Sequence, residues 1–199
     1  TDWGFLVETS GTANGSFVAG PGTSPAGSGS AEFSIDSSAG LALIGGGSYA
    51  GTALSDLTTL SYSTYRDSGT AALAPAFQIN VDADLTDADT SWQGRLVYEP
   101  YHAHTVSTGV WESWDMQDDA PGGNWWFSNG TLAANTECSQ GSPCTWSEVL
   151  TAIPNGGVHP TLGAILLKAG SAWTGGFVGN ADDLTIGVSG TDTTFDFEN

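Results

Sequence analysis

The segment GVWESWDMQDDAPGGNWWFSNG, residues 109–130, shows the pattern on which the fold of this chain depends. Two short runs rich in aromatic residues, 109–116 and 125–128, flank an acidic stretch that contains proline and glycine. Runs of this length bounded by turn-forming residues are typical of β-strands. We therefore expect two strands here, joined by a polar turn.

The same alternation of apolar and polar residues recurs along the chain, between clusters of glycine, serine, aspartate and proline. A period of two turns one face of a strand toward a core and the other toward solvent. Many strands with little helix favour an all-β chain, and we expect one antiparallel, jelly-roll-like β-sandwich over residues 1–199. The segment VAGPGTSPAGSGS, residues 18–30, is expected to be a loop. The other predicted strands are 4–8, 30–36, 41–45, 58–65, 76–85, 93–98, 164–169, 177–188 and 194–197.

One short helix is expected at residues 146–153, because the segment TWSE, residues 145–148, has the form of a capping box. In this motif the Thr145 hydroxyl accepts from the amide of Glu148, while the Glu148 carboxylate accepts from the amide of Thr145. An apolar stripe follows, and Pro154 ends the helix.

The chain is strongly acidic, with 22 Asp and Glu residues against three Lys and Arg residues and a net charge of −19. Nucleic acids and anionic lipids bind through cationic patches, so we expect neither as a partner. No apolar run approaches the ~20 residues that span a bilayer. Carboxylates in turns are typical calcium ligands, so a structural calcium ion is the expected cofactor. The simpler interpretation is that the acidic surface keeps the chain in solution.

The two cysteines, Cys138 and Cys144, lie in the segment ECSQGSPCTW, residues 137–146. Their spacing fits neither a CxxC redox motif nor a zinc site. The short intervening loop contains Gly141 and Pro143 and can bring the two sulfur atoms together, so we expect a disulfide. Disulfides persist in oxidising compartments, which indicates a secreted or cell-surface protein.

Several blocks of the sequence resemble a widespread set of secreted, mostly uncharacterised bacterial proteins. The blocks are WQGRLVYEPY (92–101), WESWD (111–115), NWW (124–126), CTWSEVL (144–150) and NADDLTIGVSGTDTTFDFEN (180–199). The resemblance implies a secreted β-sandwich and gives no catalytic residue. More loosely, LSDLTTLSYSTY (54–65) and GNADDLTIGV (179–188) are similar to strands of concanavalin-like and laminin-G-like jelly rolls. Those folds include lectins, carbohydrate-binding modules, adhesion modules and glycosidases, so the fold alone does not choose a function.

The candidate binding surface is Trp111, Trp114, Trp125 and Trp126, four of the chain's eight tryptophans. Alternate side chains of a strand share a face, so the indoles within each pair point to opposite faces. We expect one indole of each pair in the core and the other outside. An outer indole can stack on a sugar ring or anchor another subunit, unless a loop or the helix covers it.

Two groups of carboxylates are candidate calcium ligands. Carboxylates held close together raise one another's pKa unless a cation lies among them. The first group lacks the glycine and terminal glutamate of an EF-hand loop, so it could also be a solvated turn. The first group is Asp82, Asp84, Asp87 and Asp89, and the second is Asp182, Asp183 and Asp196, with Glu198 nearby.

Other polar residues form weaker patterns. His102 and His104, with Glu99 nearby, would need a further ligand to hold a transition metal, and they are more simply loop residues. Glu99 and Glu112 could face each other across neighbouring strands, as glycosidase carboxyls do. No nucleophile motif accompanies them, so we expect no enzyme. Arg95 lies within a predicted strand, where we expect an ion pair with a carboxylate.

Two non-catalytic functions remain. The preferred hypothesis is a self-associating subunit of an extracellular filament, sheath or surface layer, in which sheet edges accept a donated strand and calcium bridges acidic surfaces. The chain ends, Thr1 and Asn199, would then be held by sheet pairing or by neighbours. The alternative is a carbohydrate-binding or adhesion module that presents tryptophans to a polysaccharide. The expected partners are therefore copies of the chain or an extracellular polysaccharide.

Overall fold

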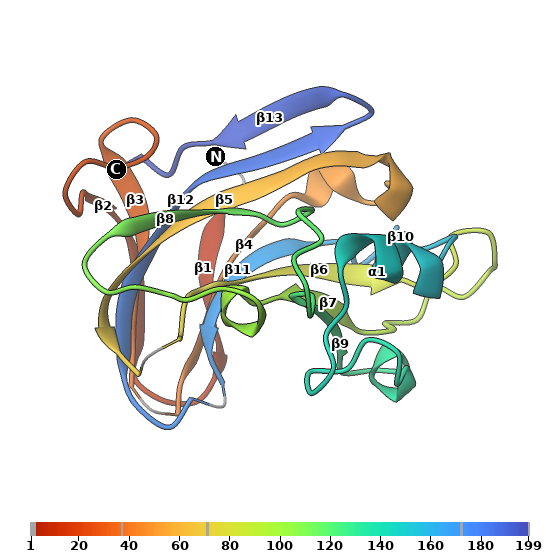
Figure 1. The fold of residues 1–199 in the computed structure, drawn as a ribbon, viewed down its shortest axis with the longest axis horizontal. Coiled ribbons are helices and arrows are strands. Elements are labelled where there is room, and N and C mark those ends of the chain that lie inside the picture. Colours follow the sequence, from red (N-terminus) through yellow and green to blue (C-terminus); the bar gives the residue numbers. More distant parts are fainter. Residues whose placement is uncertain (1–2, 37, 71, 172, 199) are drawn as a thin grey trace.

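The strands of the chain pair into two antiparallel sheets that pack face to face, as Figure 1 shows. This computed structural model describes residues 3–36, 38–70, 72–171 and 173–198. The two chain ends discussed above, Thr1 and Asn199, lie outside the described residues. The expected all-β sandwich with one short α-helix is confirmed.

The first sheet, called sheet A, has seven strands and the second, called sheet B, has six. Sheet A has the order β1 (Gly4–Thr9), β4 (Gly40–Gly45), β11 (Ile165–Gly170), β6 (Ala76–Asp82), β7 (Arg95–Tyr98) and β9 (Trp125–Ser128), with β10 (Gly157–Val158) paired to β6. Sheet B has the order β2 (Ala13–Ala19), β3 (Gly29–Ile35), β12 (Phe177–Val188), β5 (Leu57–Gly69) and β8 (Trp111–Asp115), with β13 (Thr191–Phe195) paired to β12.

Helical segments are short and lie in the connections between strands. None of those in the described ranges is long and apolar enough to cross a membrane. They are α1 (Trp146–Ala152) and the 3-10 turns η1 (Gly47–Tyr49), η2 (Leu54–Asp56), η3 (Pro100–His102) and η4 (Leu132–Ala134).

The core lies between the sheets and is built from alternate residues of each strand. Phe77 and Ile79 of β6 and Leu60 and Tyr62 of β5 are all at most 1% exposed. Burying a large apolar side chain contributes about 1.5–3 kcal/mol, so these inner rows supply the main driving force for folding. The outer faces of the sheets are left to carry polar residues and any binding site.

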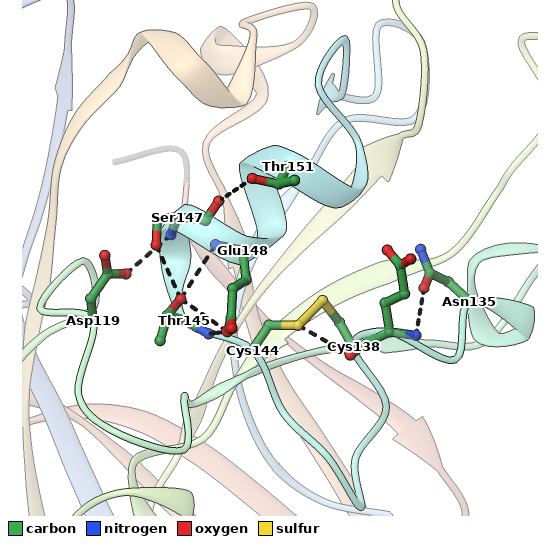
Figure 2. Close-up of a disulfide and its surroundings, with 9 residues drawn as sticks. Asp119, Asn135, Cys138, Cys144, Thr145, Ser147, Glu148 and Thr151 are labelled. Carbon is green, nitrogen blue, oxygen red and sulfur yellow. Dashed lines mark hydrogen bonds between the residues drawn. A yellow bond between two sulfur atoms is a disulfide. The ribbon is translucent and has the colours of Figure 1, made fainter.

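Helix α1 lies beside β10 at one end of the sandwich (Figure 1). Figure 2 shows the predicted capping box, in which Thr145 and Glu148 each accept from the other's backbone amide. Trp146 of α1 is buried and its ring centroid lies 5.1 Å from that of Trp125. The helix therefore covers the core where the strands end, as the apolar stripe after the cap requires.

The disulfide between Cys138 and Cys144 is present, with the two Cα atoms 5.2 Å apart. It closes the loop that enters α1, and Figure 2 shows it directly before the cap. Both cysteines are buried with the core. The prediction of a bonded pair is confirmed.

Strand β2 was not predicted, because its residues ANGSFVA contain glycine, asparagine and serine in place of a regular apolar alternation. A side chain at Gly15 would collide with the ring of Phe5, which crosses β2 at this point. Phe5 in turn packs against Phe17 and Phe33, with ring centroids 5.5 and 5.4 Å away. Glycine is required at position 15 because the Phe5 ring lies so close to the backbone. The tertiary contact therefore determines this residue, although glycine has a low propensity for strands.

The last strand begins earlier than predicted, at Thr191 instead of residue 194. Ser189 and Gly190 form the preceding turn, with φ angles of 51° and 83°. Two consecutive positive φ angles define the tight turn that joins twisted antiparallel strands directly. The predicted loop at 18–30 is likewise shorter, since β2 extends to Ala19 and β3 begins at Gly29.

Candidate functional site

A groove of about 640 Å³ lies on the outer face of sheet A. In β6, Phe77 and Ile79 point into the core, so Gln78 between them faces the groove. Val97 of β7, which lies opposite Gln78, and Lys168 of β11 also line it. The volume is within the range of about 300–1,000 Å³ that is typical of ligand sites. The groove is therefore large enough to hold a ligand.

Three aromatic side chains line this groove. Trp126 of β9 lies opposite Val97 in the register of the two strands, on the outer face. Tyr101 belongs to the turn η3 after β7, and Trp173 to the segment between β11 and β12. The ring of Trp173 packs edge-on against Phe177, with centroids 5.0 Å apart. One strand of sheet A and two connecting segments thus place three aromatic rings around the same groove.

Glu99 connects the polar groups at one wall of the groove. Its Oε2 accepts from Trp126 Nε1 at 2.9 Å and from Gln140 Nε2 at 3.4 Å. His102 Nε2 lies 3.5 Å from the same oxygen and is buried, without a hydrogen-bond partner in the described part of the chain. Burial, and then the charge of Glu99, raise the pKa of Tyr101. Glu99 therefore fixes the indole of Trp126 in one orientation.

A second polar network lies beside the groove and is centred on Glu8 of β1. Arg95 donates to both carboxylate oxygens of Glu8, at 3.2 and 2.7 Å, and Lys168 Nζ lies 2.7 Å from Oε2. Arg95 also donates to Asn80 and Gln78. Burial raises the pKa of Glu8, but the bonds and charges of the two cations outweigh it and lower the pKa to about 2. The ion pair expected for Arg95 is present.

The tryptophan pairs divide between the core and the outside, as alternation predicts. Trp125 is 1% exposed and Trp114 is 6% exposed, so neither can present a binding surface. Trp126 and Trp111 are the outer members, and both are half-buried. They lie on different sheets, because β9 belongs to sheet A and β8 to sheet B. The four indoles therefore do not form one surface, which corrects the candidate set.

Trp111 lies against Tyr65 on the outer face of sheet B, with ring centroids 5.6 Å apart. Its Nε1 donates to the carbonyl of Pro21 at 2.8 Å. A shallower hollow of about 310 Å³ lies nearby, lined by Pro21, Glu32 and Asp67. Trp111 thus serves as part of the loop packing on this sheet.

The first carboxylate group, at residues 82–89, is organised by backbone amides. Asp82 is buried and accepts from Gln93 Nε2 and from the amide of Asp84. Asp87 accepts from the amide of Asp89 at 2.7 Å. The hydrogen bonds from Thr86 lower the pKa of Asp84, and those from Ser91 lower the pKa of Asp89. These carboxylates therefore shape successive turns, as aspartate side chains do when they bond two residues ahead.

The second carboxylate group holds the loop at 20–28 against the C-terminal segment. Asp182 is buried and accepts from the amide of Ala26 at 3.0 Å. Glu198 accepts from the amide and the hydroxyl of Ser28. Burial raises the pKa of Asp182 and of Asp196, and the charge of Glu198 raises the pKa of Asp196 further. Among the described residues no three metal-ligating side chains converge in either group, and calcium binding stays a prediction.

The weaker candidates are separated by the fold. Glu99 follows β7 of sheet A, whereas Glu112 lies in β8 of sheet B, so the two do not face each other across neighbouring strands. Glu112 instead accepts from the amide of Ser107 at 2.8 Å. His104 Nε2 lies 3.6 Å from Asp118 Oδ2, whereas His102 Nε2 lies 3.5 Å from Glu99 Oε2, so the two histidines contact different carboxylates. The expectation of a facing glutamate pair is wrong, because the chain changes sheet between them.

Most residues that line the groove are not predicted by the sequence pattern. Gln78 lies in a predicted strand between two apolar residues, so its outward position could have been read from the alternation. Gln140 and Trp173 lie in connecting segments, where no periodicity gives a direction. Only folding brings them to the same opening as Trp126.

No protein-family model matches the chain, and the comparison with curated proteins found no match in sequence. Two solved structures have a similar fold, both from Clostridium thermocellum. The family 11 carbohydrate-binding module of the cellulosomal cellulase Lic26A-Cel5E has a TM-score of 0.49 and 11% identity, over 94% of this chain and 88% of that chain. A family 11 module in complex with a β-1,3-1,4-mixed-linked tetrasaccharide has a TM-score of 0.46 and 12% identity, over 94% and 89%. At these values the similarity carries no functional argument.

Proposed function

We propose that this protein is a non-catalytic, extracellular carbohydrate-binding module, and that the groove of sheet A holds a polysaccharide. One observation carries the proposal: aromatic rings and neutral amide side chains line the same groove. The aromatic rings are those of Trp126, Tyr101 and Trp173, and the amides are those of Gln78, Asn129 and Gln140.

These two kinds of side chain match the two kinds of surface on a sugar ring. The C–H groups on the faces of the ring pack against an aromatic ring, and the hydroxyl groups at its edge exchange hydrogen bonds with amides. Because Glu99 already holds the Trp126 indole, little side-chain freedom is lost on binding. The groove is thus prepared for a ligand with flat apolar faces and polar edges.

A binding role is also supported by the carboxylates of the groove. A glycosidase needs two carboxyls about 5–10 Å apart across the scissile bond. Among the described residues that line the groove, Glu99 supplies the one carboxylate. Its Oε2 is already engaged by Trp126 and Gln140. We therefore infer retention of a polysaccharide without its cleavage.

An extracellular location is supported by the disulfide between Cys138 and Cys144. Disulfides form and persist in oxidising compartments, which include the exterior of the cell.

The test compares Trp126→Ala with Trp111→Ala in affinity electrophoresis through gels that contain soluble polysaccharides. Both variants remove a half-buried outer indole, but Trp111 lies on the opposite sheet and serves as the matched control. We expect Trp126→Ala to lose about 2 kcal/mol of binding free energy, the loss typical of an aromatic anchor. Trp111→Ala should be retained like the wild type.

Two results would contradict the proposal. If the wild-type protein migrates unretarded in every polysaccharide, the groove has no such ligand. If Trp111→Ala loses retention while Trp126→Ala does not, the site is on sheet B.

Self-association is the second candidate function, and one observation favours it. Leu6 and Val7 are 51% and 49% exposed on β1, which lies at the end of the sheet order. An apolar edge strand can pair with another chain. The net charge of −19 opposes such contacts unless cations bridge them. Sedimentation velocity with and without calcium tests this candidate, and a monomer under both conditions would argue against it.

A further inference from the structure

The two cations beside the groove are both bound to one carboxylate. The chain has three Lys and Arg residues, and Arg66 of β5 in sheet B donates to the backbone carbonyls of Thr70 and Val106 in connecting segments. The other two, Arg95 and Lys168, meet at Glu8 on the outer face of sheet A. Cationic side chains are the usual anchors for ligand carboxylates. At this site the carboxylate of Glu8 binds both cations, in the position that a ligand carboxylate would otherwise take.

The backbone of β1 is shaped to put Glu8 there. The register of β1 against β4 shifts between Val7 and Thr9, so Glu8 is the extra residue of a bulge. Bulges re-aim a side chain relative to regular pairing. In the intervening strand β4, the residue opposite Lys168 is Ala42, whose side chain is a single methyl group. A bulge and a small residue together let Glu8 reach over one strand to Lys168.

Little of this network is open to an incoming ligand. The side chains of Arg95, Glu8 and Lys168 are only 17%, 15% and 15% exposed. Arg95 has further hydrogen bonds to Asn80 and Gln78, and Gln78 itself lines the groove. An acidic ligand would have to displace Glu8, and it would also approach a strongly negative protein.

We propose that Glu8 is a specificity-determining residue that excludes uronate-containing polysaccharides from the groove. The assignment rests on the proposed function and names the class of polysaccharide that the groove takes. Uncharged polysaccharides bind, because they need only the aromatic rings and the amide side chains of the groove. Polysaccharides with a carboxylate at C6 of the sugar are excluded, because Arg95 and Lys168 are already paired with Glu8. The carboxylates of Glu8 and Glu99 also repel them.

The experiment uses matched pairs of polysaccharides that differ in the oxidation of C6. Suitable pairs are β-1,4-mannan and polymannuronate, and cellulose and its C6-oxidised form. Wild-type protein, Glu8→Gln and Asp192→Asn are compared by affinity electrophoresis or by depletion on insoluble polymer. Asp192 is exposed on β13 of sheet B, so Asp192→Asn controls for the change in net charge.

We expect the wild type and Asp192→Asn to bind at least one neutral polymer and to bind its uronate counterpart at least about tenfold more weakly. Glu8→Gln should keep the neutral ligand and bind the matching uronate about tenfold more tightly than the wild type does. A gain of this size corresponds to one charge-assisted hydrogen bond.

The outcomes separate the two proposals. A wild type that binds uronates as well as neutral polymers overturns the role of Glu8 but leaves the proposed function standing. The role of Glu8 is also overturned if folded Glu8→Gln binds the uronate no more tightly than the wild type does. It is likewise overturned if Asp192→Asn gains as much affinity for the uronate as Glu8→Gln does. A wild type that binds no polysaccharide removes both proposals. The wild-type comparison needs no variant, so the exclusion of uronates stays testable even if Glu8→Gln does not fold.

Discussion

Trp125 and Trp126 are neighbours in sequence, yet they lie on opposite faces of β9 and in different surroundings. Trp125 packs against Tyr98 and Trp146, with ring centroids 5.2 and 5.1 Å away, and its Nε1 donates to the carbonyl of Met116. Trp126 lines the groove and donates to Glu99. A single residue step therefore separates a core position from a position that lines the groove.

This difference predicts two classes of alanine substitution. Trp125→Ala and Trp114→Ala should each cost about 3–5 kcal/mol of unfolding free energy, because each leaves a cavity in the core. Trp126→Ala should cost about 1 kcal/mol or less, since much of its indole is outside the core. Urea unfolding followed by circular dichroism measures all three. Equal losses at the three positions would show that Trp126 is a core residue.

Glu8 predicts a pH dependence of stability with a defined sign. Its pKa in the folded chain is about 2, below the value of 4.5 that applies when it is unpaired. A lowered folded-state pKa stabilises the protein above the unfolded value, and this contribution is lost as the pH falls from about 4.5 toward 2. The shift corresponds to on the order of 3 kcal/mol.

The measurement is the unfolding free energy of wild type and Glu8→Gln at pH 7 and at pH 3. We expect the gap between the two proteins to be largest at pH 7 and to narrow at pH 3. The other acidic residues titrate in both proteins, so the gap isolates Glu8. A gap that does not change with pH would mean that the ion pairs with Arg95 and Lys168 contribute nothing.

At the scale of single elements, the loop before α1 has two constraints. The disulfide closes it, and the capping box fixes the first turn of the helix (Figure 2). The closed loop also carries Gln140, which lines the groove. The same covalent link thus supports both the end of the core and one wall of the site.

Replacing both Cys138 and Cys144 by serine should therefore have two effects. Opening a ring of this size costs about 2–3 kcal/mol of unfolding free energy through the entropy of the unfolded chain. Retention by polysaccharide should also weaken, because Gln140 loses its fixed position. Unfolding curves and affinity electrophoresis of the same variant test both effects. Unchanged stability would show that the rest of the fold holds the loop by itself.

The elements differ in how far the sequence predicts them. Strands with regular alternation, such as β6 and β12, and the helix with its capping box are recognisable because local preference and tertiary role agree. Strand β2 is not, because Gly15 is present for contact with Phe5 rather than for strand propensity. The groove combines an alternating residue, Trp126, with Gln140 and Trp173 from irregular segments. The outward position of Trp126 was predictable from strand alternation. The positions of Gln140 and Trp173 depend on how the connecting segments fold, which no local pattern predicts.

At the scale of the whole molecule, the charge of −19 is the dominant property. We expect calcium to raise the melting temperature through one of the two carboxylate groups. A ligand that binds only the folded chain adds about 2.7 kcal/mol when present at 100 times its Kd. Differential scanning calorimetry in millimolar calcium and in excess chelator measures this effect.

Asp84→Asn and Asp182→Asn identify the group responsible. Asp182 also holds the amide of Ala26, so the quantity to compare is the increment caused by calcium in each variant. The variant at the binding group should lose this increment, while the other keeps it. Equal melting temperatures of the wild type with calcium and with chelator would exclude a stabilising site.

The aromatic cluster around Trp3 joins distant parts of the polypeptide. Trp3 lies edge-on to Phe195 and to Phe197, with ring centroids 5.2 and 5.5 Å away. Residues near the beginning and near the end of the described chain are therefore neighbours in space. A circular permutant, with a short glycine-rich linker between these segments and new termini opened at the exposed Ser189-Gly190 turn, should keep the native far-ultraviolet spectrum and cooperative melting. The same proximity lets the fold be inserted into a surface loop of a host protein, where entry and exit must lie side by side.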